Sequence, residues 1–203
     1  MEKIDFKKEY KELYSAKAAK AKMVEVPKFS FLMVDGRGDP NKEKSFSEAV
    51  EALYSVAYTA KFMFKEDEEV PDYVVPPLEG LWWAEDMEAF EGGRKDEWLW
   101  TLMILQPKWF SKKTLAEAQK KLRGKKDLPG LDKLRLESFR EGKAAQIMHV
   151  GPYSEERATI EKMFAFIKEQ GHTLSGKHHE IYLSDPRRCA PEKLKTILRH
   201  PVA

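Results

Sequence analysis

The chain has 203 residues, of which 42% are hydrophobic and 11% aromatic, so it can bury a core in one domain or in two small ones. Its 36 basic residues nearly balance its 34 acidic ones and leave a net charge of +2, which argues against direct binding to nucleic acid, because such proteins usually carry a strong basic excess. The single cysteine, Cys189, excludes an intrachain disulfide, and no apolar run has the length of a signal peptide or a membrane span, so we expect a cytoplasmic protein that does not act at a membrane.

Residues 1–25 form a lysine-rich segment ahead of the first strand pattern. Phe6, Tyr10, Leu13 and Tyr14 recur within it at near-helical spacing. We expect an N-terminal arm or short helix that lies on the body of the protein; a solvated charged helix with one apolar face is the simplest interpretation.

The next part of the chain, residues 26–109, is typical of a strand, a helix and two further strands. "VPKFSFLMVDGRGDP" is β-rich and ends in glycines and a proline, and residues 45–64 carry apolar side chains at helical spacing. Two aromatic-rich strand patterns follow, "YVVPPLEGLWWAED" and "DEWLWTLMILQP", separated by the turn-forming "AFEGGRK". Residues 111–123 then predict a connector helix that ends at Gly124.

The second half, residues 134–202, repeats this order. "KLRLESFREGKAAQIMHVGPY" predicts a hairpin-like pair of strands around "REGK", "SEERATIEKMFAFIKEQG" predicts a helix, and "HEIYLSDP" and "LKTILRHPV" predict two strands. The motifs also align: "FLMVDGRG" with "QIMHVGPY", "LWWAED" with "IYLSDP", and "MILQP" with "ILRHP". We therefore predict an α+β fold of two duplicated β-α-β-β modules related by a pseudo-twofold axis, with antiparallel sheets, helices on one face and a ligand groove between the halves.

The strand pattern "HHEIYLSD" carries the candidate binding residues. Side chains alternate along a strand, so His178, Glu180 and Tyr182 share one face while Ile181 points to the other. In the repeat alignment Trp82 matches Tyr182, which places an aromatic ring on the same face in both halves. Two rings with a carboxylate between them suit a flat aromatic ligand, including a cationic one. The alternative is ordinary core packing beside an exposed, salt-bridged glutamate.

Other chemical motifs are weak. His178 and His179 are neighbours on a strand and point to opposite faces, and no third ligand stands at metal-binding spacing, so we predict no metal site and no cofactor. "GRGD" lacks the spacing of a phosphate-binding loop, and no G-x-S-x-G motif occurs. Cys189 falls in an expected loop beside Arg187 and Arg188, and we interpret it as a bystander thiol.

Several of these motifs together resemble the GyrI-like small-molecule-binding family: "HVGPYSEERATIEKMFAFIKEQGH", "HHEIYLSDPRR", "LKTILRHPV", "VDGRGDPN" and "EGLWWAED". The resemblance extends from about residue 26 to 202. It implies a single domain over residues 26–203, built from duplicated SHS2-type β-α-β-β modules, with a pocket between the halves that binds drugs and other amphipathic compounds. A stand-alone, tryptophan-rich subgroup is similar to cyclopropanoid cyclopropyl hydrolases, which open the strained ring of DNA-alkylating compounds inside an aromatic cage.

The resemblance also implies roles for individual residues. Glu180 matches the buried acidic residue of the family pocket, and Tyr182, Tyr153, Trp82 and Trp100 fall at aromatic positions of the pocket or cage. Glu180, Tyr182 and Tyr153 are therefore the candidate catalytic residues. The candidate ligand-binding residues are Trp82, Trp100, Tyr182, Glu180, Tyr58 and Phe62, the last two from a second aromatic stripe on the first predicted helix of the body.

These assignments predict a detoxifying hydrolase that opens a cyclopropyl ring without a metal. Two alternatives stay open: a non-catalytic binding or sequestering protein with the same pocket, and an effector-sensing partner of a transcription regulator, since no helix-turn-helix pattern is attached. A module that binds a partner protein is a further alternative, although no exposed interaction face marks it. The expected partner is a small molecule, and the expected state is a monomer or a weak homodimer.

Overall fold

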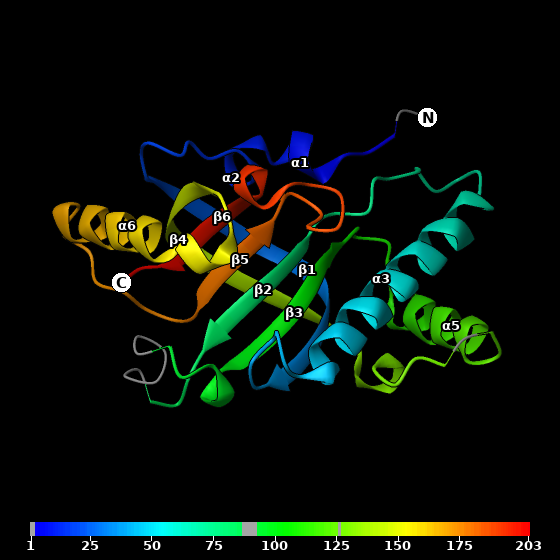
Figure 1. Ribbon diagram of the computed structural model, residues 1–203. Helices are drawn as coiled ribbons and strands as arrows, with labels where there is room; N and C mark the ends of the chain where they lie inside the picture. The colour runs from blue at the N-terminus through cyan, green and yellow to red at the C-terminus, as the bar shows by residue number, and fades with distance from the viewer. Residues whose placement is uncertain (1–2, 87–92, 126) are drawn as a thin grey trace.

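The computed structural model describes residues 3–86, 93–125 and 127–203 (Figure 1). Within these residues six antiparallel strands form one closed sheet in the order β1-β3-β2-β5-β6-β4. The strands are β1 (Lys22–Arg37), β2 (Leu78–Trp83), β3 (Leu99–Gln106), β4 (Arg135–Val150), β5 (His178–Tyr182) and β6 (Lys195–Pro201). The α-helices are α1 (Phe6–Glu9), α2 (Lys11–Tyr14), α3 (Lys44–Lys65), α5 (Lys112–Arg123) and α6 (Arg157–Glu169), and the short 3₁₀ helices are η1 (Lys95–Glu97), η2 (Leu131–Lys133), η3 (Tyr153–Glu155) and η4 (Pro191–Lys193). No helix of the described part combines the length and apolarity needed to cross a bilayer.

The α+β fold has the predicted order of elements in both halves. The first half runs β1, α3, β2, β3 and the second runs β4, α6, β5, β6, with α5 between them. β1 pairs with β4 and β2 pairs with β5, so exchanging the two halves reproduces the strand order around the closed sheet. This is the order that a pseudo-twofold axis between the halves would produce.

The predicted hairpin around "REGK" is wrong. β4 is one continuous strand of 16 residues, because β1 has the same length and pairs with it from Lys22–Gln146 to Met33–Arg135. Gly142, the glycine that suggested a turn, lies inside this ladder with a φ of 78°, a conformation that glycine adopts without steric cost. Residues 89–92 of the predicted turn "AFEGGRK" lie outside the described residues.

The helices cover both faces of the sheet, so the expectation of helices on one face is wrong for the N-terminal helices. α3 packs on Leu32 and Ile104, whereas α1 packs, through Phe6, on Phe31 and Met33. Neighbouring residues of a strand point to opposite faces, so α1 covers the face that α3 leaves open. The N-terminal arm removes this second apolar face from water, and Figure 1 shows α1 and α2 along one edge of the molecule, apart from α3 and α6.

A buried polar network lies on the face of β5 that points away from α6. His179 is held between two carboxylates, with Glu79 Oε2 2.9 Å from Nε2 and Glu141 Oε2 3.0 Å from Nδ1. Tyr14 of α2 donates its hydroxyl hydrogen to Glu79 over 2.8 Å, and Arg199 of β6 donates to Glu141 over 3.1 Å. The two carboxylates are balanced by one guanidinium and one protonated imidazole, and all five side chains are buried.

The same network fastens the backbone of the N-terminal arm. Arg199 Nη2 donates to the carbonyl oxygen of Leu13 over 2.8 Å, and Gln146 Nε2 donates to that of Glu12 over 2.9 Å. Both carbonyls belong to α2, a helix of only four residues, which could not hold its place by its own hydrogen bonds. The arm is therefore tied to the sheet by buried charge as well as by its apolar side chains.

Glu141 and His179 stabilise each other's ionised forms. Burial alone would lower the pKa of His179, but the charges and hydrogen bonds of Glu141 and Glu79 outweigh it and raise this pKa to about 9. Burial alone would raise the pKa of Glu141, but His179 and Arg199 outweigh it and lower this pKa to about 2. At neutral pH the imidazole is therefore protonated and Glu141 is ionised.

We expect the network to stabilise the fold most where His179 is charged. A histidine whose pKa rises from 6.5 to about 9 on folding contributes its full stabilisation below pH 6.5 and loses it as the pH rises through 9. The difference in unfolding free energy between the wild type and His179→Gln should therefore shrink, by an amount on the order of 3 kcal/mol, between pH 6 and pH 10. Urea denaturation at a series of pH values measures it, with His172→Gln, a half-exposed histidine outside the network, as the control. A difference that stays constant with pH would mean that His179 is not charged in the folded protein.

Candidate functional site

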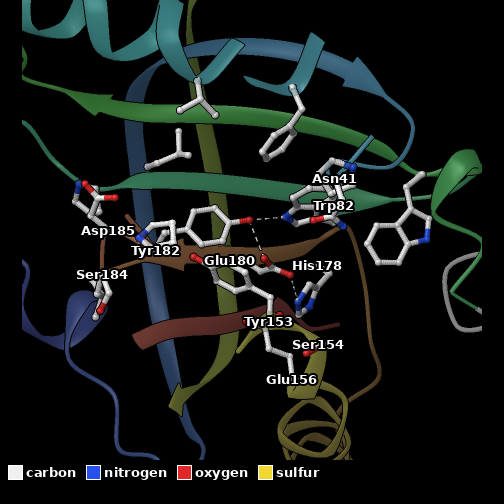
Figure 2. Close-up of a pocket in the computed structure, with 18 of the residues that line it drawn as sticks. Asn41, Trp82, Tyr153, Ser154, Glu156, His178, Glu180, Tyr182, Ser184 and Asp185 are labelled. Carbon is white, nitrogen blue, oxygen red and sulfur yellow. Dashed lines mark hydrogen bonds and ion pairs between the residues drawn. The ribbon is translucent and has the colours of Figure 1, made fainter. Parts of the chain in front are cut away.

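A cavity of about 1820 Å³ lies between α3 and the start of α6, over the paired strands β2 and β5 (Figure 2). Its aromatic lining consists of Phe46, Tyr54, Tyr58, Trp82, Trp98, Tyr153, Phe164 and Tyr182. Its polar lining includes Glu156, His178, Glu180 and His200. The cavity thus combines rings from both halves of the chain with buried or half-buried carboxyl and imidazole groups from the second half.

A chain of hydrogen bonds crosses the wall of the cavity from one half to the other. Trp82 Nε1 on β2 donates to the hydroxyl oxygen of Tyr182 on β5 over 3.1 Å, and Tyr182 donates its hydroxyl hydrogen to Glu180 Oε2 over 2.7 Å. His178 Nε2 lies 3.5 Å from the other carboxylate oxygen, Oε1. Figure 2 shows these four side chains converging in the middle of the cavity. Glu180 is therefore oriented by groups on both sides of its carboxylate.

Gly80 makes the contact between Trp82 and Tyr182 possible. It is the residue opposite Glu180 in the β2–β5 ladder, and it lies on the cavity face two positions before Trp82. A Cβ atom at position 80 would lie 2.8 Å from Trp82 Nε1 and 3.1 Å from the Tyr182 hydroxyl oxygen. Even a methyl group would therefore press on both partners of the hydrogen bond, and glycine leaves the room that they need.

The aromatic walls are packed edge to face. The ring of Tyr153 meets that of Tyr182 at 83° with centroids 5.8 Å apart, and Trp98 meets Trp82 at 69° with centroids 5.9 Å apart. Phe46 of α3 lies 5.9 Å from the Trp82 ring. Rings held in this way present both faces and edges to the cavity and can enclose a planar ligand with little loss of side-chain freedom.

The structure brings most of the predicted site residues together. Trp82, Tyr182, Glu180 and Tyr153 all line the cavity and lie within one connected cluster of contacts. Tyr58 also lines it, from α3, with 46% of its surface exposed. Their arrangement is that of a pocket wall rather than of a solid core.

Trp100 and Phe62 lie elsewhere. Trp100 is fully buried in the core beneath the cavity, where its ring packs edge-on against Phe46 at 5.2 Å and over Gly36, its partner in the β1–β3 ladder. A Cβ atom at Gly36 would lie 2.0 Å from the indole, so the ring can occupy this position only because residue 36 has no side chain. Phe62 is 58% exposed on α3 and is not among the residues that line the cavity.

Two buried ionisable groups of the cavity outside the hydrogen-bonded chain, Glu156 and His200, are kept neutral. Burial and, to a smaller degree, the charge of Glu180 raise the pKa of Glu156 to about 9. Burial and the neighbouring His178 lower the pKa of His200 to about 4. At neutral pH the cavity therefore holds a protonated carboxyl group and an uncharged imidazole beside Glu180.

The two adjacent histidines point to opposite sides of β5, as the alternation of strand side chains predicts. His178 faces the cavity beside Glu180, while His179 belongs to the network beneath the N-terminal arm. Among the described residues no group of three His, Cys, Asp or Glu side chains stands close enough to hold a metal ion.

The tyrosine hydroxyl groups of the cavity stay protonated. Burial, reinforced by Glu180, raises the pKa of Tyr182 well above its usual value. Burial, followed by the charges of Glu156 and Glu180, raises the pKa of Tyr153 to about 12. Both groups can therefore donate hydrogen bonds at neutral pH, although the Tyr182 hydrogen is already directed at Glu180.

The sequence model of a protein family, the GyrI-like small molecule binding domain, matches residues 20–203. The chain belongs to this family. The resemblance found in the sequence is thereby confirmed, and the cavity between α3 and α6 is the feature of this GyrI-like domain that can accommodate a small molecule. No curated protein matches the chain.

Three solved structures from Listeria innocua are similar to this GyrI-like domain over its whole length. An uncharacterized conserved protein is 46% identical with a TM-score of 0.91, and 99% of this chain and 100% of that one are covered. A protein described as a hydrolase is 44% identical with a TM-score of 0.89, and 100% of both chains are covered. Another described as a hydrolase is 43% identical with a TM-score of 0.87, and 99% of this chain and 100% of that one are covered.

Sequence reasoning missed several residues of the cavity. Phe46 and Trp98 both line the cavity. The helical spacing around Phe46 is equally typical of a core residue, and the face to which Trp98 points depends on local strand geometry that the sequence does not reveal. Glu156 stands where an acidic residue usually favours the positive end of a helix dipole, yet it is 6% exposed and makes no capping hydrogen bond. The motif "GPYSEE" could have indicated Glu156 as a site residue, because the same short segment supplies Tyr153 to the cavity.

We expect Trp82 to be essential for binding a planar aromatic ligand and its neighbour Trp83 to be dispensable. The two residues are adjacent on β2, but Trp82 lines the cavity and Trp83 packs on the opposite face. Stacking of a flat ring on an aromatic side chain is worth roughly 1–3 kcal/mol, so Trp82→Leu should raise the Kd of 9-aminoacridine about tenfold or more. Trp83→Leu should change it less than about twofold. Isothermal titration calorimetry on variants with wild-type circular dichroism measures both, and equal effects would place the ligand outside this cavity.

Proposed function

We propose that this GyrI-like domain is a hydrolase that takes up planar or amphipathic aromatic compounds and opens the cyclopropyl ring of cyclopropanoid, DNA-alkylating xenobiotics. The observation that carries the proposal is the hydrogen-bonded chain from Trp82 through Tyr182 to Glu180 on the wall of a large aromatic cavity. The similarity to two L. innocua proteins described as hydrolases, at 43% and 44% identity, supports a hydrolytic role.

The reaction needs a base for water and a proton donor for an oxygen atom. In a cyclopropane fused to a dienone, the oxygen of water bonds to the ring methylene, the strained C–C bond breaks, and its electron pair converts the dienone into an aromatic phenolate. One proton leaves the attacking water and another reaches the phenolate oxygen, so the product is the substrate plus one molecule of water. Ring strain and aromatisation drive the reaction, which leaves positioning and proton transfer to the protein.

Glu180 is the proposed base. Its carboxylate accepts the hydroxyl hydrogen of Tyr182 over 2.7 Å and lies 3.5 Å from His178 Nε2, so groups of the protein itself fix its orientation. The side chain is 15% exposed, which leaves a path for water to reach it from the cavity. A carboxylate held in this way can orient a water molecule and accept its proton.

Tyr182 and Tyr153 have different roles in the proposed reaction. Tyr182 positions Glu180, because its hydroxyl hydrogen is directed at the carboxylate and its oxygen accepts from Trp82. Tyr153 stands edge-on to Tyr182 with its hydroxyl group protonated and 40% of its surface exposed, so it can hydrogen-bond the oxygen on which negative charge develops. Trp82 and Trp98 would hold the planar part of the substrate in line.

A non-catalytic binding protein is the second candidate, and one observation favours it. Tyr182, Glu180 and Trp82 are joined to one another by hydrogen bonds, an arrangement that also suits a fixed carboxylate that recognises a cationic aromatic compound. A sequestering protein or an effector-sensing partner of a regulator would need no more than this. Binding and turnover must therefore be measured separately.

We expect Glu180→Gln to abolish most of the turnover and to leave binding largely intact. General base catalysis contributes typically about 10²–10⁴-fold, so kcat for the opening of a cyclopropane-fused dienone should fall by that order, as measured by chromatography of the ring-opened alcohol. Glutamine keeps the acceptor for Tyr182, so the Kd for the ring-opened product should change less than about fivefold.

The control variant is Glu161→Gln, because Glu161 also lines the cavity but is exposed and paired with Arg157. It should keep the wild-type kcat. Full activity in Glu180→Gln would remove Glu180 from the mechanism, and a wild-type protein that binds the compound without any turnover would establish the binding role instead.

A further inference from the structure

Two of the carboxyl groups that line the cavity are mostly buried, and the second of them is not expected from the sequence. Glu180 lies on β5, and Glu156 is the residue immediately before α6 (Figure 2). Glu156 is only 6% exposed, and its side chain makes no hydrogen bond to the first turn of α6. It therefore does not serve as a helix cap, although its position in the chain would allow it.

The two carboxyl groups have unequal hydrogen bonding. Glu180 accepts a hydrogen from Tyr182 and has His178 beside its other oxygen. Glu156 has the hydroxyl group of Thr196 beside it, but its Oε1 is buried and makes no hydrogen bond of good geometry within the described residues. Donors stabilise a carboxylate, whereas a buried oxygen without a donor favours the neutral acid. The negative charge therefore belongs on Glu180 and the proton on Glu156.

We propose that Glu156 and Glu180 form a one-proton carboxyl pair, in which Glu156 is the acid that protonates the ligand oxygen and Glu180 is the base. This inference rests on the proposed function, because it assigns the source of the second proton in the same reaction. It also defines the substrate class: a neutral aromatic compound with a hydrogen-bond-accepting carbonyl oxygen at the end of the cavity formed by η3 and α6.

The charged groups around Glu156 are consistent with this assignment. Burial and the nearby charge of Glu180 raise the pKa of Glu156 to about 9, while Thr196 and the more distant Lys95 lower it only in part. Tyr153 and Tyr182 also face it and remain neutral, because the pKa of each is itself raised by burial and by these carboxyl groups. Two like charges in one buried site cannot both form easily, which is why one proton stays with the pair.

Glu156 is a better proton source than Tyr153. An ordinary phenol has a pKa of about 10, so a proton would move uphill from Tyr153, whose pKa is about 12, to the phenolate of the product. Glu156 is another protonated group at this end of the cavity, and a carboxylic acid is in general a stronger proton donor than a phenol. Tyr153 can then stabilise the oxygen by a hydrogen bond while Glu156 supplies the proton.

The proton balance of the turnover closes within the pair. Water gives a proton to the Glu180 carboxylate as its oxygen bonds to the ring methylene, and Glu156 gives its proton to the oxygen of the opening dienone. At the end Glu180 is protonated and Glu156 is ionised. Transfer of one proton from Glu180 to Glu156, directly or through a solvent water, restores the starting state without any other reagent.

Infrared spectroscopy of the wild-type protein tests the pair without any substrate. The C=O stretch of a buried protonated carboxyl group should be present at pH 7 and disappear around pH 9. Glu156→Gln should remove this band and Glu155→Gln, an exposed neighbour, should keep it. In Glu180→Gln the titration of the band should move down by at least about one pH unit, because the neighbouring charge is gone. A wild-type protein without the band at pH 7, or a band that survives in Glu156→Gln, overturns the inference.

Turnover of a cyclopropane-fused dienone gives the second readout. Glu156→Gln should lower kcat by about 10²-fold or more and remove the decline of kcat on the basic side of the pH profile, while Glu155→Gln should match the wild type. An unchanged kcat and pH profile in Glu156→Gln overturns the catalytic role. If the wild type binds the compound but does not open it, the proposed hydrolase function fails, and the infrared titration still decides whether the two carboxyl groups share one proton.

Discussion

The antiparallel pairing of β2 with β5 is the contact on which both polar clusters of this protein depend. It joins the two halves, and its alternating side chains divide the ionisable groups between two faces. Glu79 and His179 point to the face under the N-terminal arm, whereas Trp82 and Glu180 point into the cavity. A shift of this ladder by a single residue would exchange the faces and place the cavity groups under the arm.

The two clusters treat buried charge in opposite ways. Under the arm, Glu141 meets a guanidinium and a protonated imidazole, so its ionised form is stable and the cluster ties the arm to the sheet. In the cavity, Glu180 accepts a hydrogen bond from the neutral hydroxyl group of Tyr182, and Glu156 has no cation in contact among the residues that the structure describes, so a proton remains on Glu156. The first arrangement suits a permanent structural tie, and the second leaves acid–base capacity available to a ligand.

Much of the site follows from local sequence patterns, and the remainder depends on contacts between distant residues. The period of two along "HHEIYLSD" separates His178 and Glu180 from His179, and the duplicated order of elements gives the topology of both halves. Trp100 was expected in the pocket but is buried in the core, because its position is decided by Gly36 across the β1–β3 ladder. The burial of Glu156 was equally hidden, since the same residue type in the first helical turn is usually exposed and favourable.

Gly80 gives this arrangement an evolutionary signature. Changing a glycine codon to an alanine codon requires one nucleotide substitution, yet the added methyl group would press between the indole of Trp82 and the phenol of Tyr182. A descendant with alanine at this position would have to give up that pairing or lose one of the two rings. The residue at position 80 can therefore sort homologous sequences into those that retain the indole–phenol–carboxylate relay and those whose pockets have diverged.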